Sequence, residues 1–322
     1  MEQNYLEIEY FHSILKKMEN HMKRSVILDV DTGIDDAVAI AMATYSNKLN
    51  VKLITTVCGN LSVNDVTKNT LNFLQAIGKT KIPVAGGANA PLEREKDNSI
   101  QAHGKRGLGK YKFPPCTLKP IKTDAVDKMY EVITKSKDKI VIIALGPLTN
   151  VARLLIEHPD AKDNIDYILI SGGLLNDSKK NPYLGFNVMQ DPESAKYVLK
   201  SGENIIICPS NHGHTAYLDL EDIEKIRQTN KTGEMLEFIF RSYKDRHVKV
   251  GAATHDPCAI TYVAHPEYFK TEDMYVHIRF IEKLNTGVID FDTNHSPNMK
   301  VATEINAKKF KKLFFATLKK MP

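Results

Sequence analysis

The chain has 322 residues, of which 42% are hydrophobic and 26% charged, so it can bury the core of a globular protein. This composition excludes collagen, disordered chains and disulfide-rich scaffolds. The net charge of +5 resides at the ends, because residues 1–21 carry −2, residues 300–322 carry +6 and the remainder only +1. We therefore expect no nucleic-acid partner.

Cysteine spacing and hydropathy predict the compartment. The four cysteines form no CxxC pair and no metal-ligand spacing, which suits a reducing environment. No apolar run is long enough to span a bilayer, and the N-terminus lacks the pattern of a secretory signal. We therefore expect a cytoplasmic protein that has no membrane partner.

The first residues are expected to lie outside the folded domain. Met22 is followed at once by a basic pair and an apolar run. Residues 1–21 are therefore interpreted either as a loosely attached extension or as a segment upstream of a natural start at Met22. The domain itself is expected to cover residues 22–322.

Short apolar runs alternate with segments of helical spacing along this domain. The runs are short and mostly continuous, as expected for strands buried on both faces. The alternation predicts one α/β domain with an open, mostly parallel sheet flanked by helices. The expected strands are Ser25–Val30, Val51–Val57, Lys139–Leu145, Asp166–Ser171, Asn204–Cys208 and Met274–Ile281. The expected helices are Asp35–Ser46, Val63–Ile77, Ala125–Ser136, Thr149–His158, Pro192–Ser201 and a final amphipathic helix with Phe310, Leu313, Phe314 and Thr317 on one stripe.

The first predicted strand ends in four acidic residues, Asp29, Asp31, Asp35 and Asp36. Mutual repulsion makes such a group costly unless a cation binds it, and oxygen ligands favour Ca²⁺ or Mg²⁺ over zinc. A helix N-terminus would explain only Asp35 and Asp36. Ligands of open parallel sheets bind beyond the carboxyl ends of the strands, so this position predicts a metal site.

Two other acidic motifs were compared with this segment. An EF-hand loop counted from Asp29 would require an acidic residue at Ile40, and helices would flank the loop. A phosphatase of the haloacid dehalogenase type also begins with strand-D-x-D, but its pattern does not continue with Gly33. The phosphatase stays as the weaker alternative.

Further polar clusters follow the other predicted strands. Together with the first acidic segment they are VILDVDTGIDDAVAI at 26–40, CGN at 58–60, HGKRGLG at 103–109, ALGPLTNVA at 144–152, ISGG at 170–173, GFNVMQDPESA at 185–195 and HDP at 255–257. These segments resemble the inosine–uridine-preferring nucleoside hydrolase family and follow the family's order over most of residues 24–265. The resemblance implies an α/β fold with a bound Ca²⁺ and an enzyme that hydrolyses the N-glycosidic bond of ribonucleosides.

The resemblance also implies the roles of individual residues. The Ca²⁺ ligands would be carboxylates and one backbone carbonyl, with the attacking water and ribose hydroxyls completing the shell. Asp31 would in addition act as the general base toward that water. Asp29 is not a ligand in this scheme. The implied ligands are Asp31, Asp36, the carbonyl of Leu145 and Asp256; the implied ribose contacts are Asp35, Asn60 and Asn187.

Departure of the base requires a proton or a strong hydrogen bond, and His255 is the implied donor. His103 would lie near the base, and Tyr243 is a weaker candidate for closing over it. Purine-restricted members use tryptophan stacking, whereas this chain contains no Trp. The histidines without Trp favour the broad or pyrimidine-preferring branch.

The chain departs from the family pattern in three places. Gly185 replaces a glutamate that contacts the ribose 5′-hydroxyl, and Ser171 replaces a methionine against the ribose. The segment Asn211-His212-Gly213-His214 replaces the more usual D-V-T-H. These changes leave base preference and the 5′ contact open. A nucleoside-binding protein without turnover is therefore a second alternative, and a homodimer or homotetramer is expected from the resemblance.

Overall fold

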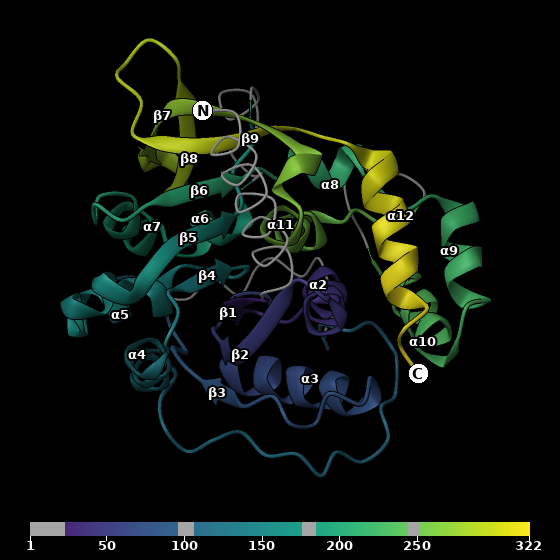
Figure 1. Ribbon diagram of the computed structural model, residues 1–322. Helices are drawn as coiled ribbons and strands as arrows, with labels where there is room; N and C mark the ends of the chain where they lie inside the picture. Colours follow the sequence, from purple (N-terminus) through teal and green to yellow (C-terminus); the bar gives the residue numbers. More distant parts are fainter. Residues whose placement is uncertain (1–22, 96–105, 176–184, 244–250) are drawn as a thin grey trace, which may run out of the picture.

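The computed structural model describes residues 23–95, 106–175, 185–243 and 251–322 (Figure 1). A nine-stranded sheet has the order β3-β2-β1-β4-β5-β6-β9-β7-β8. Neighbours from β3 to β9 run parallel, whereas β7 pairs antiparallel with both β9 and β8. The strands are β1 Arg24–Val30, β2 Leu49–Thr56, β3 Val84–Gly86, β4 Ile140–Ala144, β5 Ile165–Ser171, β6 Ile205–Cys208, β7 Phe269–Ile281, β8 Thr286–Asp292 and β9 Met299–Ile305.

Helices cover both faces of the sheet, as Figure 1 shows. Most follow a strand directly, as in the predicted alternation. The α-helices are α2 Ile34–Tyr45, α3 Val63–Ala76, α4 Ala125–Lys135, α5 Thr149–Glu157, α6 Phe186–Gln190, α7 Pro192–Leu199, α8 Asn211–Thr215, α9 Leu220–Arg227, α10 Lys231–Phe240, α11 His255–Ala264 and α12 Ala307–Leu318. Short 3₁₀ helices lie at Pro159–Asn164, Pro266–Tyr268 and Glu282–Leu284.

Each face of the sheet has its own hydrophobic core. Alternate residues of β1 point to opposite sides, so Leu28 belongs to the core that includes residues of α2, α3, α10, α11 and α12, whereas Ile27 belongs to the core that includes residues of α4, α5 and α7. The central strands are buried on both faces, which explains why they read as continuous apolar runs. The single α/β domain predicted from the sequence is confirmed.

The expected strands and helices are all present, with boundaries shifted by a few residues. The final helix buries Phe310, Phe314 and Thr317 and exposes lysines, as its stripe predicts. Strands β3, β8 and β9 were not predicted. Residues 1–21 lie outside the described part. No described helix is both long and apolar enough to cross a membrane.

The order of the strands reverses around β1. The chain passes from β1 to β2 and β3 on one side, and then returns to β4 on the other side of β1. The chain connections beyond the carboxyl ends of β1 and β4 therefore lead in opposite directions, and in open α/β sheets ligands bind at such a reversal. The segments beginning at Asp31 and Leu145 leave the sheet at this point.

Candidate active site

Asp31 directly follows β1 and is 1% exposed. Its Oδ2 accepts the backbone N–H of Asn60 at 2.8 Å, and the Asn60 side chain donates to its backbone oxygen at 3.2 Å. A Cβ at Gly59 would lie 2.2 Å from the same Oδ2. The loop after β2 can therefore hold this carboxylate only because residue 59 is glycine.

Asp36 lies in the first turn of α2 and folds back onto the preceding loop. Its two oxygens accept the backbone N–H groups of Asp31 at 3.2 Å and Gly33 at 2.9 Å. These bonds fix the orientation of the carboxylate and satisfy backbone donors at the helix N-terminus. The helix start therefore accounts for part of the acidic cluster.

Asp256 reaches the same place from the first turn of α11, more than 200 residues further along the chain. One oxygen each of Asp35, Asp36 and Asp256 lies within 4.8 Å of the other two. The three side chains are 8%, 1% and 5% exposed. This spacing brings together the carboxylate oxygens that a hard divalent cation prefers, so the residues present fit Ca²⁺. Asp35, expected to bind ribose, lies in this group beside Asp36 and Asp256.

Burial and mutual repulsion hold these carboxyl groups toward the neutral state. Loss of water, and to a smaller extent the neighbouring Asp35, raises the pKa of Asp31 to about 7, although the Asn60 backbone hydrogen bond lowers it. Burial, followed by repulsion from the other aspartates, raises the pKa values of Asp36 and Asp256 well above their ordinary value. A bound cation would offset both effects and favour the ionised carboxylates.

The Leu145 carbonyl also lies at this edge of the sheet. It accepts a hydrogen bond from the Asn187 side-chain amide at 2.5 Å, and the same amide contacts the carbonyl of Ser171 at 3.2 Å. The Ser171 hydroxyl donates to an oxygen of Asp256 at 2.9 Å. The predicted ligand Leu145 and the predicted ribose contacts Asn187 and Ser171 are therefore joined to the aspartate group by one hydrogen-bond network.

Asp29 lies in β1, two residues before Asp31, and is fully buried. Its Oδ1 accepts hydrogen bonds from Thr55 at 2.6 Å and Asn150 at 2.8 Å, while its Oδ2 has no hydrogen-bond partner among the described residues. Burial raises the pKa of Asp29 to about 7. Asn150 belongs to the segment ALGPLTNVA at 144–152, but nothing in the sequence indicates that its side chain donates to Asp29.

His255 begins α11 beside Asp256. Its Nδ1 lies 2.9 Å from the backbone oxygen of Ser210, and its ring packs edge-to-face with that of His214, with centroids 4.8 Å apart. Because a carbonyl can only accept, Nδ1 carries a hydrogen, and Nε2 is the ring nitrogen that can gain or lose a proton without breaking this bond.

Tyr243 and His103 are the two remaining residues predicted to contact the base. Tyr243 follows α10, where its backbone N–H donates to Phe240 and its ring is half-buried against the core. His103 lies outside the described residues.

Asp191, which precedes Pro192 and Glu193 in the sequence as an N-cap residue commonly does, has a structural role. It caps α7 through Ser194, and its Oδ2 also accepts from Thr149 at 2.6 Å and from the backbone of Leu92 at 2.8 Å. These bonds connect three segments at the carboxyl edge of the sheet. A cap motif gives no indication of such distant partners.

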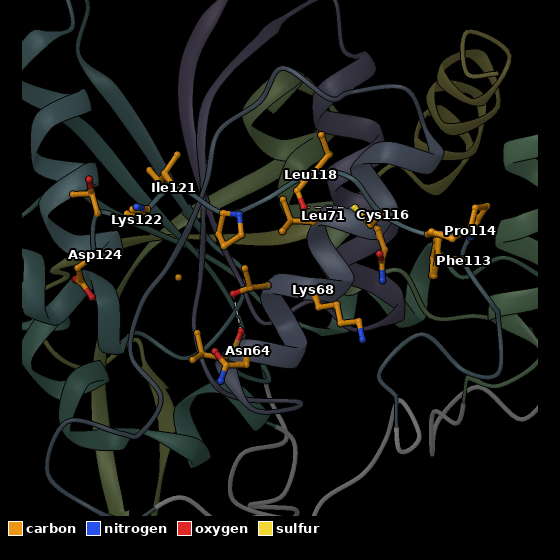
Figure 2. Close-up of a pocket in the computed structure, with 17 residues that line it drawn as sticks. Asn64, Lys68, Leu71, Phe113, Pro114, Cys116, Leu118, Ile121, Lys122 and Asp124 are labelled. Atoms are coloured by element: carbon orange, nitrogen blue, oxygen red, sulfur yellow. Dashed lines mark hydrogen bonds between the residues drawn. The ribbon is translucent and has the colours of Figure 1, made fainter.

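A separate cavity of about 700 Å³ lies between α3 and the extended segment 113–124 (Figure 2). Its wall includes Leu71, Phe113, Leu118 and Ile121, with Lys68 at one side. No predicted site residue within the described part lines this cavity. It is therefore distinct from the aspartate group.

Comparison with known sequences identifies the family to which the chain is similar. Residues 26–312 match the model of the family described as inosine-uridine preferring nucleoside hydrolase. The chain is 34% identical to the non-specific ribonucleoside hydrolase RihC of Escherichia fergusonii, over 90% of this chain and 96% of the relative. It is 33% identical to RihC of an Escherichia coli strain, over 94% and 100% respectively.

Solved structures agree with these sequence matches. A plant nucleoside hydrolase, PpNRh1, superposes with a TM-score of 0.83 at 28% identity and covers 92% of this chain and 99% of its own. A purine-preferring ribonucleoside hydrolase from Gardnerella vaginalis superposes with a TM-score of 0.82 at 24% identity, covering 92% and 98%. The second similarity shows the shared fold.

The aspartate group predicts stabilisation by Ca²⁺. At 100 times its dissociation constant, Ca²⁺ should stabilise the folded protein by about 2.7 kcal/mol, or roughly 5 °C in Tm. Differential scanning fluorimetry with Ca²⁺ and with Mg²⁺ measures this shift. Asp256→Asn should lose the shift, and Asp166→Asn, an exposed change at the start of β5, should retain it. A full shift in Asp256→Asn would contradict the site.

The raised pKa values predict how this stabilisation depends on pH. Without metal, the folded protein keeps protons on Asp29 and Asp31 up to about pH 7. The unfolded chain releases these protons near the ordinary aspartate pKa of 3.8. Their contribution to stability is therefore present at about pH 4 and is lost as the pH rises to about 7. Ca²⁺ binding displaces protons, so its Tm shift should be larger at pH 8 than at pH 5.5. An equal shift at both values would contradict this linkage.

Proposed function

Because the chain belongs to the inosine–uridine-preferring nucleoside hydrolase family and is a nucleoside N-ribohydrolase, we propose that it hydrolyses purine and pyrimidine ribonucleosides to the free base and ribose with Ca²⁺. The convergence of buried aspartates at the reversal of strand order supports this proposal. The broad base range is supported by the printed name of the RihC relatives and by the absence of Trp.

The proposed Ca²⁺ site consists of Asp31, Asp36, Asp256 and the Leu145 carbonyl. The mutual spacing of carboxylate oxygens supports Asp36 and Asp256, and it adds Asp35, rather than Asp31, as the third member of the group. When bound, Ca²⁺ would lower the pKa of a coordinated water and hold the ribose hydroxyls. Asp35, Asn60 and Asn187 are proposed to bind those hydroxyls.

Asp31 is the proposed general base. As the C1′–N bond breaks, positive charge develops on the ribose, and the surrounding carboxylates stabilise it. Water forms the new bond to C1′ and gives its proton to Asp31. The Asn60 backbone N–H holds one Asp31 oxygen and thereby orients the carboxylate for this transfer.

His255 is the proposed proton donor to the departing base. The Ser210 carbonyl fixes the hydrogen on Nδ1, so Nε2 delivers the proton to the nitrogen that leaves C1′. His103 and Tyr243 are proposed to contact the base, and Ser171 to contact the ribose while it positions Asp256. The electron pair of the broken bond stays on the base, which leaves as a neutral molecule.

We also propose a cytoplasmic homodimer or homotetramer. The four cysteines are free, and three of them are buried, as is common in reducing compartments. Large apolar side chains that could contribute to a subunit contact are exposed on α5, α7 and β7, namely Ile156, Tyr197 and Phe280.

Asp31→Asn should lower kcat for inosine and uridine by about 10²- to 10⁴-fold, because the amide cannot accept the proton. A reducing-sugar assay measures ribose release, and circular dichroism checks the fold. Asp166→Asn is the control. Near-normal turnover by Asp31→Asn would refute the assigned base.

Phosphate release from p-nitrophenyl phosphate would support the phosphatase alternative, and nucleoside binding without ribose release by the wild type would support the non-catalytic alternative.

His255→Ala should lower kcat for inosine and uridine by about 10²-fold or more but leave p-nitrophenyl riboside nearly unchanged, because that leaving group needs no proton. Steady-state kinetics on the three substrates measure the difference. His295→Ala, a change of an exposed histidine near β8, should affect none of them. An equal loss on all three substrates would remove His255 as the acid.

Gly185→Glu tests the missing 5′ contact. No described atom lies within 4 Å of a Cβ added at Gly185, whose backbone is in a conformation that other residues adopt. The added carboxylate should raise kcat/KM for uridine about tenfold relative to 5′-deoxyuridine, since it gains one hydrogen bond to the 5′-hydroxyl. Gly185→Leu should leave this ratio unchanged. If Gly185→Glu changed kcat/KM equally for uridine and 5′-deoxyuridine, the glutamate would not contact the 5′-hydroxyl.

A further inference from the structure

We propose that His214 is a positioning residue that fixes the ring of His255, and that the segment Asn211-His212-Gly213-His214 is the support on which His255 rests. This inference depends on the proposed function, in which His255 protonates the leaving base. The segment forms α8, a short helix that follows β6. Nothing in the proposed reaction otherwise accounts for its four residues.

The first two residues of α8 anchor it to the rest of the fold. The Asn211 side chain accepts the backbone N–H of Leu175 at 2.8 Å and donates to its carbonyl at 3.1 Å. His212 is 2% exposed, and its Nε2 lies 3.0 Å from the carbonyl of Ala302 in β9. Burial lowers the pKa of His212 to about 4, so its ring is a neutral structural donor. The helix is thus tied to the loop after β5 and to β9.

Gly213 lets α8 approach the start of α11 very closely. A Cβ at this position would lie 2.3 Å from Nδ1 of His255 and 2.6 Å from its backbone nitrogen. The Gly213 carbonyl also accepts the backbone N–H of Thr254 at 3.3 Å. Any larger residue would separate the two helices, so the glycine brings the His255 ring against the backbone of α8.

His214 supplies the contact that the backbone cannot. The hydrogen bond between Nδ1 and the Ser210 carbonyl sets the direction of the His255 ring, and a single hydrogen bond still allows the ring to swing about that direction by small angles. The ring of His214 stands at 87° to that of His255 with a centroid separation of 4.8 Å. This edge-to-face contact restricts the ring plane and therefore the direction in which Nε2 points.

The test compares leaving groups in three variants. His214→Ala should lower kcat for inosine and uridine about tenfold, less than loss of His255 itself, and leave p-nitrophenyl riboside unchanged. His214→Phe retains an aromatic ring and should recover most of the activity. His295→Ala is the matched control, because that histidine is exposed and lies in the turn after β8.

Three kinetic outcomes would overturn the proposal. No loss in His214→Ala would show that the contact is dispensable. An equal loss on p-nitrophenyl riboside would indicate a general structural effect. Equal loss in His214→Phe and His214→Ala would mean that a nitrogen of His214, not its ring packing, is required.

A measurement on the ligand-free protein separates this inference from the proposed function. The imidazole Cε1–H signal of His255, assigned by its disappearance in His255→Gln, is recorded by NMR in the wild type and both His214 variants. We expect His214→Ala to shift or broaden this signal and His214→Phe to retain a single sharp signal. An unchanged signal in His214→Ala would overturn the positioning role, whether or not the protein releases ribose.

Discussion

Repulsion among buried carboxylates is the constraint on which the site depends. Asp31, Asp36 and Asp256 lose water as the chain folds, which raises their pKa values, and the neighbouring charge of Asp35 adds to the rise in all three. Such a group is unfavourable unless a cation or protons neutralise it. The group lies where the strand order reverses at β1, which is where open α/β sheets bind their ligands.

The backbone makes the repulsive arrangement possible. N–H groups of Asp31, Gly33 and Asn60 donate to the carboxylates and fix their directions before any ligand binds. Glycine at position 59 lets the chain approach closely enough to make one of these contacts, because a side chain there would collide with Asp31. An arrangement fixed in advance needs little reorganisation during a reaction.

Much of the fold followed from local patterns. Continuous apolar runs predicted the central strands, and the alternation with helices predicted a parallel sheet. Strand β9 was missed because its residues from Met299 onward alternate only weakly between buried and exposed. Its place in the sheet was not predictable either, because it lies between β6 and β7 in space but follows both in sequence. The acidic residues after β1 identified the site because four carboxylates in eight residues have no simpler explanation at a strand end.

The sequence by itself determined the class of fold, the position of the acidic cluster and, through the family motifs, the class of reaction. Only the tertiary structure decided that Asp35 and Asp36 lie beside Asp256, that Asn150 supports Asp29, and that His214 packs on His255. The reason is physical: hydrophobic periodicity reports which face of an element is buried, a local property. Contacts between distant residues depend on how strands are ordered and how closely loops approach, and no local pattern records these distances.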